Sequence, residues 1–187
     1  MRIISGSSKG KKILEPKDLN TRPLKDLTKE SIFNILAHSN KFSIKLKNSN
    51  ILDLFSGVGS FGLECLSRGC SNLTFVENYT HVLPILKKNI SSLNYQDSSL
   101  IIEDNIIDNL NFNIFAKKFD IIFMDPPYKE KNLSSILINI AKFDILNEEG
   151  IIVIHRHKNE KDKFPAKFNI IEEKTYGISR VIFMSYL

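Results

Sequence analysis

The sequence predicts an α/β protein whose central sheet is mostly parallel and ends in an antiparallel hairpin. Short apolar runs alternate with segments long enough to form helices, which is the pattern of parallel strands joined by helical crossovers. The last two runs, residues 168–175 and 180–186, are joined by a link too short for such a helix, so they should pair as a hairpin. A glycine-rich turn after the first run is typical of doubly wound sheets that bind a nucleotide at one edge.

The first 27 residues are expected to form a basic extension with a role of its own. Residues 1–30 carry eight Lys and Arg against four Asp and Glu, so they supply +4 of the chain's net charge of +5. This asymmetry indicates a polyanionic partner, most simply a nucleic acid, with a solvated lysine-rich arm as the alternative. Apolar residues at 3–4 and 12–14 predict a small β-hairpin. The side chains expected to contact phosphates are those of Arg2, Lys9, Lys11, Lys12 and Arg22.

Residues 28–187 are expected to form one domain, because no linker or repeat divides them. It should begin with an amphipathic helix over residues 28–37, for which Asp26 or Thr28 is available as the N-cap. Five apolar runs then predict parallel strands at residues 50–55, 73–77, 100–103, 119–125 and 150–155.

The apolar runs also limit where the protein works. The longest are far too short to span a bilayer, and lysines occupy the N-terminus where a signal sequence needs apolar residues, so we expect a cytoplasmic protein with no membrane partner. Cys65 and Cys70 lie five positions apart, a spacing that predicts buried thiols rather than a disulfide framework or a zinc site.

Three glycines, Gly57, Gly59 and Gly62, complete a G-x-G-x-x-G pattern between a strand and a helix, where a ligand can approach the backbone. The pattern alone would fit NAD. However, Asp53 precedes the loop and no Lys or Arg lies between residues 51 and 67, so a pyrophosphate would meet only negative charge. A ligand with an ammonium and a sulfonium fits better, which predicts S-adenosylmethionine (SAM).

Acidic residues follow two further strands of the predicted sheet. Glu77 ends the second strand about 20 residues after the glycine loop, where a carboxylate accepts hydrogen bonds from ribose hydroxyls. Asp104 ends the third strand and could accept a bond from an adenine amino group, with a surface-loop role as the alternative. We expect the adjacent Phe55, Asn78 and Asn105 to belong to the same donor site.

The fourth strand ends in MDPPY, and its two consecutive prolines predict a stiff, extended turn. The Asp125 carboxylate and the Pro126 carbonyl are two acceptors for the N–H donors of an exocyclic base amine, which would direct its lone pair toward an incoming methyl group. Tyr128 could stack on that base. The loop therefore predicts direct methyl transfer to nitrogen, with no metal required.

Six motifs spread over nearly the whole chain carry a resemblance to a known family. They read RIISGSSKGKKILEP, TRPLKDLTKESIFNIL, DLFSGVGSFGLECLSRG, FVEN, DPPY and YGISRV. The middle ones are general to amino-directed class I methyltransferases, whereas with the first two the chain resembles the RsmD-type guanine-N2 methyltransferases of bacterial small-subunit ribosomal RNA. The resemblance implies a Rossmann-like, seven-stranded class I methyltransferase sheet with an N-terminal hairpin.

The same resemblance implies SAM as the donor, N2-methylguanine in 16S rRNA as the product, and 16S rRNA or the assembling small subunit as the partner of a monomeric enzyme. By matching motif positions it implies donor binding at Asp53, Gly57, Gly59, Glu77 and Asp104. It implies target binding at Asp125, Pro126 and Tyr128.

The chain departs from the family pattern at several positions. Leu24 and Leu27 replace polar and basic residues, and Ile178 replaces a frequent acid. His155 stands where an acid commonly ends the fifth strand, and it opens the sequence HRH. Two histidines two positions apart without a third ligand favour a solvated or RNA-facing strand end over a metal site.

The sequence leaves four other functions as alternatives. A DNA amino-methyltransferase would use the same chemistry but generally adds a recognition domain for which the chain has little room. A protein glutamine methyltransferase typically has Asn before the two prolines. An NAD-dependent oxidoreductase is disfavoured by Asp53, and a non-catalytic RNA-binding protein would leave the DPPY loop unexplained.

Overall fold

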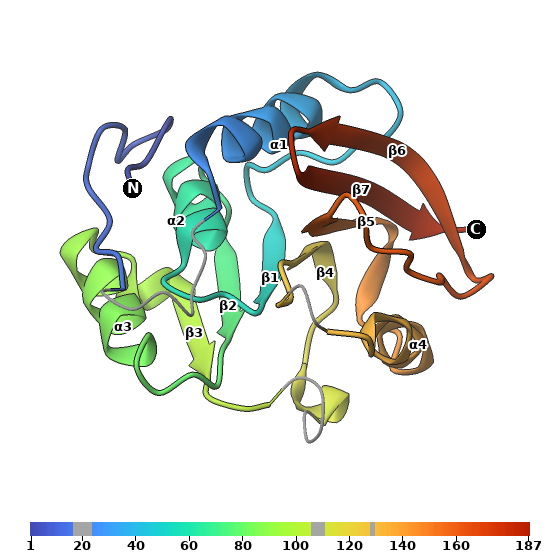
Figure 1. Cartoon of the computed structure of the whole chain (residues 1–187). Helices are drawn as coiled ribbons and strands as arrows, with labels where there is room; N and C mark the ends of the chain where they lie inside the picture. Colours follow the sequence, from blue (N-terminus) through green and yellow to red (C-terminus); the bar gives the residue numbers. More distant parts are fainter. Residues whose placement is uncertain (17–23, 106–110, 128–129) are drawn as a thin grey trace.

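The computed structural model describes residues 1–16, 24–105, 111–127 and 130–187 (Figure 1). Its described residues form one seven-stranded sheet in the order β3-β2-β1-β4-β5-β7-β6. The strands β1 to β5 run parallel, and β7 pairs antiparallel with both β5 and β6, as the sequence predicts. Their bounds are β1 Asn50–Leu54, β2 Asn72–Val76, β3 Ser99–Ile102, β4 Phe119–Met124, β5 Leu146–His157, β6 Phe168–Tyr176 and β7 Ser179–Tyr186.

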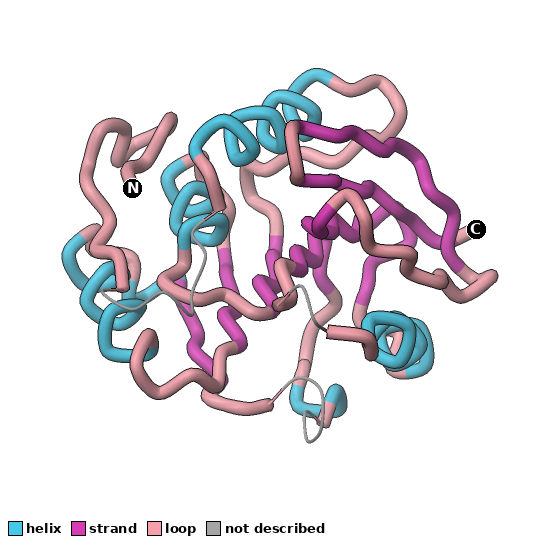
Figure 2. Tube along the Cα trace, viewed as in Figure 1, coloured by secondary structure: helices cyan, strands magenta, loops and turns pink. Residues whose placement is uncertain are grey.

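Helices cover both faces of this sheet (Figure 2). Successive residues of a strand point to opposite faces, so Ile51 and Phe123 join one buried cluster while Leu52 and Ile122 join the other. The first cluster packs under α1, α2 and α3, and the second packs under α4. The helix bounds are α1 Asp26–His38, α2 Ser60–Ser67, α3 Leu83–Ser92 and α4 Leu133–Lys142.

The start of α1 differs from the expectation. The residue in the N-cap position is Lys25, and it makes no side-chain capping bond. Asp26 lies inside the first turn, where its charge favours the helix dipole, and Thr28 is buried against the core. Side-chain capping by Asp26 or Thr28 was therefore a wrong prediction, although the helix itself is confirmed.

The N-terminal extension forms a hairpin closed by an antiparallel bridge between Arg2 and Lys12. It lies against α2 and α3 (Figure 1) and is not a free arm, because its Ile3 and Ile13 are buried in the first apolar cluster. The domain boundary expected after residue 27 therefore marks a change in charge along the sequence. The segments on its two sides are packed into the same apolar cluster.

Polar contacts fasten the hairpin along α2. The fully buried carboxylate of Glu64 accepts the backbone N–H groups of Ile4 at 2.7 Å and Ser5 at 2.9 Å. One turn further, the Ser67 carbonyl accepts the N–H of Ser7 at 2.8 Å. A buried carboxylate bonded to two amides holds these two segments in one relative position.

The helices among the described residues are all too short or too polar to cross a membrane. Cys65 and Cys70 are both buried free thiols, as the spacing predicts. Burial raises the pKa of the Cys65 thiol well above its usual range and that of Cys70 to about 12, so both are unreactive near neutral pH.

Candidate active site

The carboxyl ends of the parallel strands bring two of the predicted residues, and one residue that was not predicted to belong to the site, to one edge of the sheet. Leu54 pairs with Val76 on one side and with Met124 on the other, and Met124 pairs with Ile154. The residues that follow these positions in β2, β4 and β5 are Glu77, Asp125 and His155. Glu77 and Asp125 therefore flank the turn that follows β1, and His155, which is still within β5, lies next to Asp125.

Asp53 is almost fully buried, at 1% exposure, in the next-to-last position of β1. Its Oδ2 atom accepts the N–H of Gly62 at 3.1 Å, whereas Oδ1 is buried and has no hydrogen-bond partner among the described residues. Burial raises the pKa of the Asp53 carboxyl well above its usual range, and the nearby charges of Asp125 and Glu77 raise it further. An unpaired buried carboxylate oxygen is costly unless a cationic or donor group completes it.

Glu77 closes the glycine loop from the neighbouring strand. One carboxylate oxygen accepts the N–H of Gly57 at 2.7 Å, and the other accepts those of Asn78 at 2.9 Å and Tyr79 at 2.8 Å. Gly57 and Gly59 both have a positive φ, at 55° and 85°, which side-chain-bearing residues rarely adopt. The buried carboxylate thus holds the turn in a conformation that glycine makes possible.

The third glycine of the pattern has a packing role. A Cβ atom at Gly62 would lie 2.4 Å from the Phe75 ring of β2, so its absence lets α2 approach the sheet. At Gly59 a Cβ would lie 2.7 Å from Leu86 of α3. At these two glycines the missing Cβ therefore makes room for protein neighbours.

The remaining predicted donor residues lie along the same edge. Phe55 is half-buried directly after β1, with a left-handed φ of 61°. Asp104 follows β3, is half-buried, and accepts the N–H of Asn105 at 2.7 Å. Asn78 follows Glu77 with an exposed side chain. All of these residues occur at strand ends, but their order along the edge separates Asp104 from Asp125 by two strands.

Asp125 is the first residue after β4, and its carboxylate contacts β5. Its Oδ1 lies 2.8 Å from Nδ1 of His155, and the two side chains are 20% and 8% exposed. Nε2 of His155 is buried and has no partner among the described residues. Pro126 is buried beside them. Tyr128 and Arg22, predicted to contact the base and the RNA, lie outside the described residues.

The prediction for the HRH sequence was wrong at its first two residues. His155 is 6% exposed and Arg156 only 1%, so neither is a solvated or RNA-facing side chain. The register of the two strands explains the position of His155. Met124 of β4 pairs with Ile154 of β5, so the next residues, Asp125 and His155, also lie beside each other. In the described ranges no group of three or more His, Cys, Asp or Glu side chains is arranged to hold a metal ion.

The four described cations of the hairpin are all exposed. Lys29, which is fully buried in α1, donates to the Arg2 carbonyl at 2.9 Å and to Ser60 at 3.3 Å, so Arg2 lies near the start of α2. The turn that carries Lys9 lies at the opposite end, beside Ser67. The hairpin therefore extends its positive charge away from the carboxylate edge along one face of the domain.

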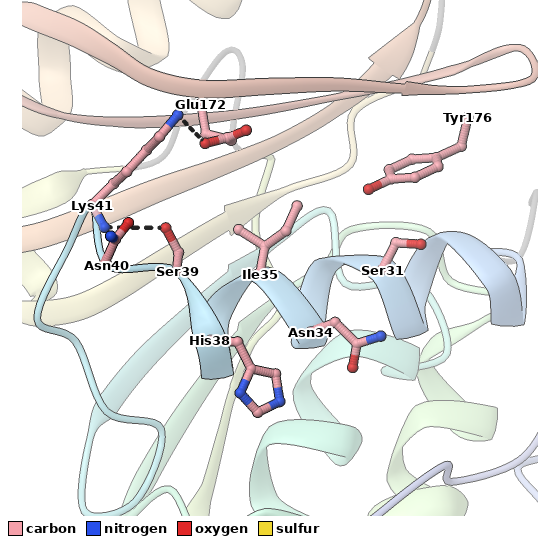
Figure 3. A pocket seen from close by; sticks show the side chains of 9 residues that line it. All are labelled: Ser31, Asn34, Ile35, His38, Ser39, Asn40, Lys41, Glu172 and Tyr176. Carbon is pink, nitrogen blue, oxygen red and sulfur yellow. Dashed lines mark hydrogen bonds and ion pairs between the residues drawn. The ribbon is translucent and has the colours of Figure 1, made fainter.

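A separate groove of about 660 Å³ lies between α1 and β6 (Figure 3). Side chains of α1, among them Ser31, Ile35 and His38, form one wall, and an ion pair of Lys41 with Glu172 crosses one end. Tyr176 borders the other end, near the β6–β7 turn. None of the predicted donor or target residues lines this groove, so it is distinct from the carboxylate edge.

Sequence comparison relates the whole chain to known proteins. The profile of a family described as conserved hypothetical protein 95 matches residues 1–185. YlbH of Bacillus subtilis, assigned as an rRNA methyltransferase, is 33% identical over 185 residues, which is 97% of this chain and 96% of that protein. The ribosomal RNA small subunit methyltransferase D of Haemophilus influenzae is 30% identical over 179 residues, which is 95% of this chain and 90% of that protein.

Solved structures share the architecture. The structure of yhhF from Escherichia coli, assigned as a methyltransferase, matches with a TM-score of 0.82 at 25% identity and covers 100% of this chain and 97% of that one. A protein from Haemophilus influenzae, assigned as a methylase, matches with a TM-score of 0.74 at 28% identity and covers 100% of this chain and 98% of that one.

Proposed function

The chain belongs to the conserved hypothetical protein 95 family of RsmD-type methyltransferases, and we propose that it methylates the exocyclic N2 amino group of a guanine in 16S ribosomal RNA, with SAM as the donor. The named relatives support ribosomal RNA as the substrate. The donor and the target atom are proposed from the residues at the carboxylate edge.

The observation that carries the donor proposal is the unpaired, buried Oδ1 of Asp53. When bound, SAM supplies a methyl group activated by its positive sulfonium. Oδ1 of Asp53 offers an acceptor for the ammonium group of such a ligand, and ligand charge would compensate the burial of this carboxylate. Glu77 is the acceptor proposed for the ribose hydroxyls, since its two oxygens retain further lone pairs beyond the three amides they accept.

Asp125 and Pro126 are proposed to hold the amino group that is methylated. A carboxylate oxygen and a carbonyl oxygen together accept both N–H donors of an sp² amine, which turns its lone pair toward the donor. As the N–C bond forms and the C–S bond breaks, the nitrogen carries one proton too many, and Asp125 is the base proposed to receive it. Tyr128 is proposed to stack on the base.

The test is methylation of 16S rRNA, as naked RNA and as small subunits, by the protein with SAM, followed by nucleoside mass spectrometry. The expected product is N2-methylguanosine. A matched RNA with inosine at the modified position lacks the N2 amino group, so it should accept no methyl group. Methylated inosine, or a guanine methylated at a ring nitrogen, would rule out the proposed target atom.

A further inference from the structure

Arg156 occupies an unusual position for a charged side chain. It lies near the end of β5 and is the largest side chain among those that are fully buried in the described residues. A guanidinium ion is almost never buried without several hydrogen-bond acceptors, because the loss of its hydration is costly. Its acceptors therefore show what the surrounding structure uses it for.

Two of these acceptors belong to the loop that follows β4. One terminal nitrogen of Arg156 donates to the Pro127 carbonyl at 3.2 Å, and the other donates to the Glu130 carbonyl at 2.9 Å. The N–H of Glu130 itself bonds to the Pro127 carbonyl at 2.8 Å. A single planar group thus ties together the two described ends of this loop, directly after Asp125 and Pro126.

The charge of Arg156 is balanced on its other side. Its Nε donates to Asp162 at 3.2 Å, and a terminal nitrogen lies 3.0 Å from the same carboxylate. Arg180 also donates to Asp162, at 2.9 Å, and stands directly opposite Arg156 in the β5–β7 pairing. Two facing cations would repel each other, so Asp162 stabilises the pair. Of the two arginines, only Arg156 donates hydrogen bonds to the Pro127 and Glu130 carbonyls among the bonds of the described residues.

We propose that Arg156 is a positioning residue, which fixes the backbone that presents Asp125 and Pro126 to the target amine. This inference rests on the proposed function of that loop. A lysine in the same place would carry its three donors on one nitrogen, without the planar fork whose separate nitrogens reach Pro127, Glu130 and Asp162. Loss of the fork should leave the donor site intact and misplace the acceptor groups.

The test compares Arg156→Lys with Arg180→Lys. Both variants replace one guanidinium on Asp162 by an ammonium at paired strand positions, and only the first removes bonds to the loop. Arg156→Lys is expected to lower kcat about 100-fold, the usual effect of misplacing a reacting group by about 1 Å, with SAM affinity within twofold of wild type. Arg180→Lys is expected to keep kcat within threefold, at a similar change in melting temperature.

Hydrogen exchange supplies a readout that does not depend on the reaction. The Glu130 amide should exchange at least about fivefold faster in Arg156→Lys, and at the wild-type rate in Arg180→Lys, because only the first variant loosens the loop. Normal kcat and exchange in Arg156→Lys, or equal losses in both variants, would overturn the proposal. If the wild type methylates another atom, the proposed function fails, and the exchange and kcat comparison still decides the role of Arg156.

Discussion

Asp125 and His155 are joined across two parallel strands by a 2.8 Å contact between Oδ1 and Nδ1. One oxygen of Asp125 is thereby engaged, and the carboxylate is held in a single orientation, so the other oxygen is the one expected to face the target amine.

Removal of this contact should slow methyl transfer without affecting the donor. His155→Leu is expected to reduce kcat by about 10- to 150-fold, because a hydrogen bond to a charged group is worth about 1.5–3 kcal/mol. His155→Gln should recover part of that loss, since its amide can still donate.

Asp125→Ala should abolish transfer while SAM affinity stays within a few fold. The measurements are single-turnover methylation and calorimetry, and an active Asp125→Ala would exclude the loop from the reaction.

The raised pKa of Asp53 predicts a pH-dependent stability. The unfolded carboxyl titrates near 3.8, so between that pH and the higher folded value the native state binds more protons than the unfolded state. The free energy of unfolding contributed by this group therefore falls as pH rises through the window. Asp53→Asn should show a smaller decrease in ligand-free stability from pH 4 to pH 8 and should lose its stabilisation by SAM.

Thermal unfolding at both pH values, with and without SAM, checks this expectation. Asp120→Asn is the matched control, because Asp120 belongs to β4 near its amino end, away from the donor loop. Its variant should keep the SAM-induced shift in melting temperature. An unchanged shift in Asp53→Asn would remove Asp53 from the donor site.

Glu77→Ala should weaken SAM binding at least tenfold. The substitution removes the acceptor proposed for ribose and also frees the Gly57 amide that fixes the glycine loop, at a combined cost of about 1.5–3 kcal/mol or more. Glu103→Ala, one strand away and exposed, is the control and should bind normally. Calorimetry with SAM and with NAD measures both variants, and tight NAD binding by the wild type would contradict the donor assignment.

The basic hairpin predicts a change in salt dependence. Substituting Lys9, Lys11 and Lys12 together by Gln should reduce the slope of log RNA affinity against log salt by about 2–3 units, using about 0.7–0.9 per phosphate contact. Because Ile3 and Ile13 are buried, these substitutions are a cleaner test than deleting the hairpin. The control is Lys45, Lys47 and Lys117 changed to Gln at the amino ends of β1 and β4. A wild-type slope for the hairpin variant would show that the hairpin does not bind phosphates.

Two glycines of the same hairpin test its attachment to α2. A Cβ at Gly6 would lie 1.9 Å from the Ser67 carbonyl oxygen, whereas at Gly10 nothing lies within 4 Å. Both have a positive φ near 84°, so alanine costs about 1–2 kcal/mol of backbone strain at either position. Gly6→Ala should lose about 1–3 kcal/mol more through the forced displacement. Denaturant unfolding measures this difference, and equal losses would mean that the hairpin is not held against Ser67.

The sequence predicted correctly those features whose position depends only on the order and direction of the strands. The apolar runs predicted all seven described strands, and the acids at their ends fall along one edge because parallel strands share a direction. The end of β5 was misjudged because composition says nothing about burial. Arg156 is buried among acceptors from other segments, and its counter-charge, Asp162, lies in an irregular segment six residues later. Such a segment has no periodicity from which its path could be predicted.

The glycine loop shows a second limit of the same kind. The sequence placed three glycines at a strand-to-helix turn, but it could not show that Gly62 faces Phe75, a residue of the next strand. Tertiary neighbours decide whether a missing Cβ serves a ligand or a packing contact. For the same reason the hairpin could be predicted from residues 1–14, while its attachment to Glu64 could not.

The bonds of the hairpin also impose an order of assembly during synthesis. Ile4 and Ser5 are translated well before their acceptor Glu64, and Ser8 well before Tyr95, whose hydroxyl it contacts. The N-terminal residues must therefore wait, without their final partners, until about half of the chain has emerged. Closing such long loops is entropically slow, so the hairpin is translated before its partners and is among the last segments to reach its native contacts.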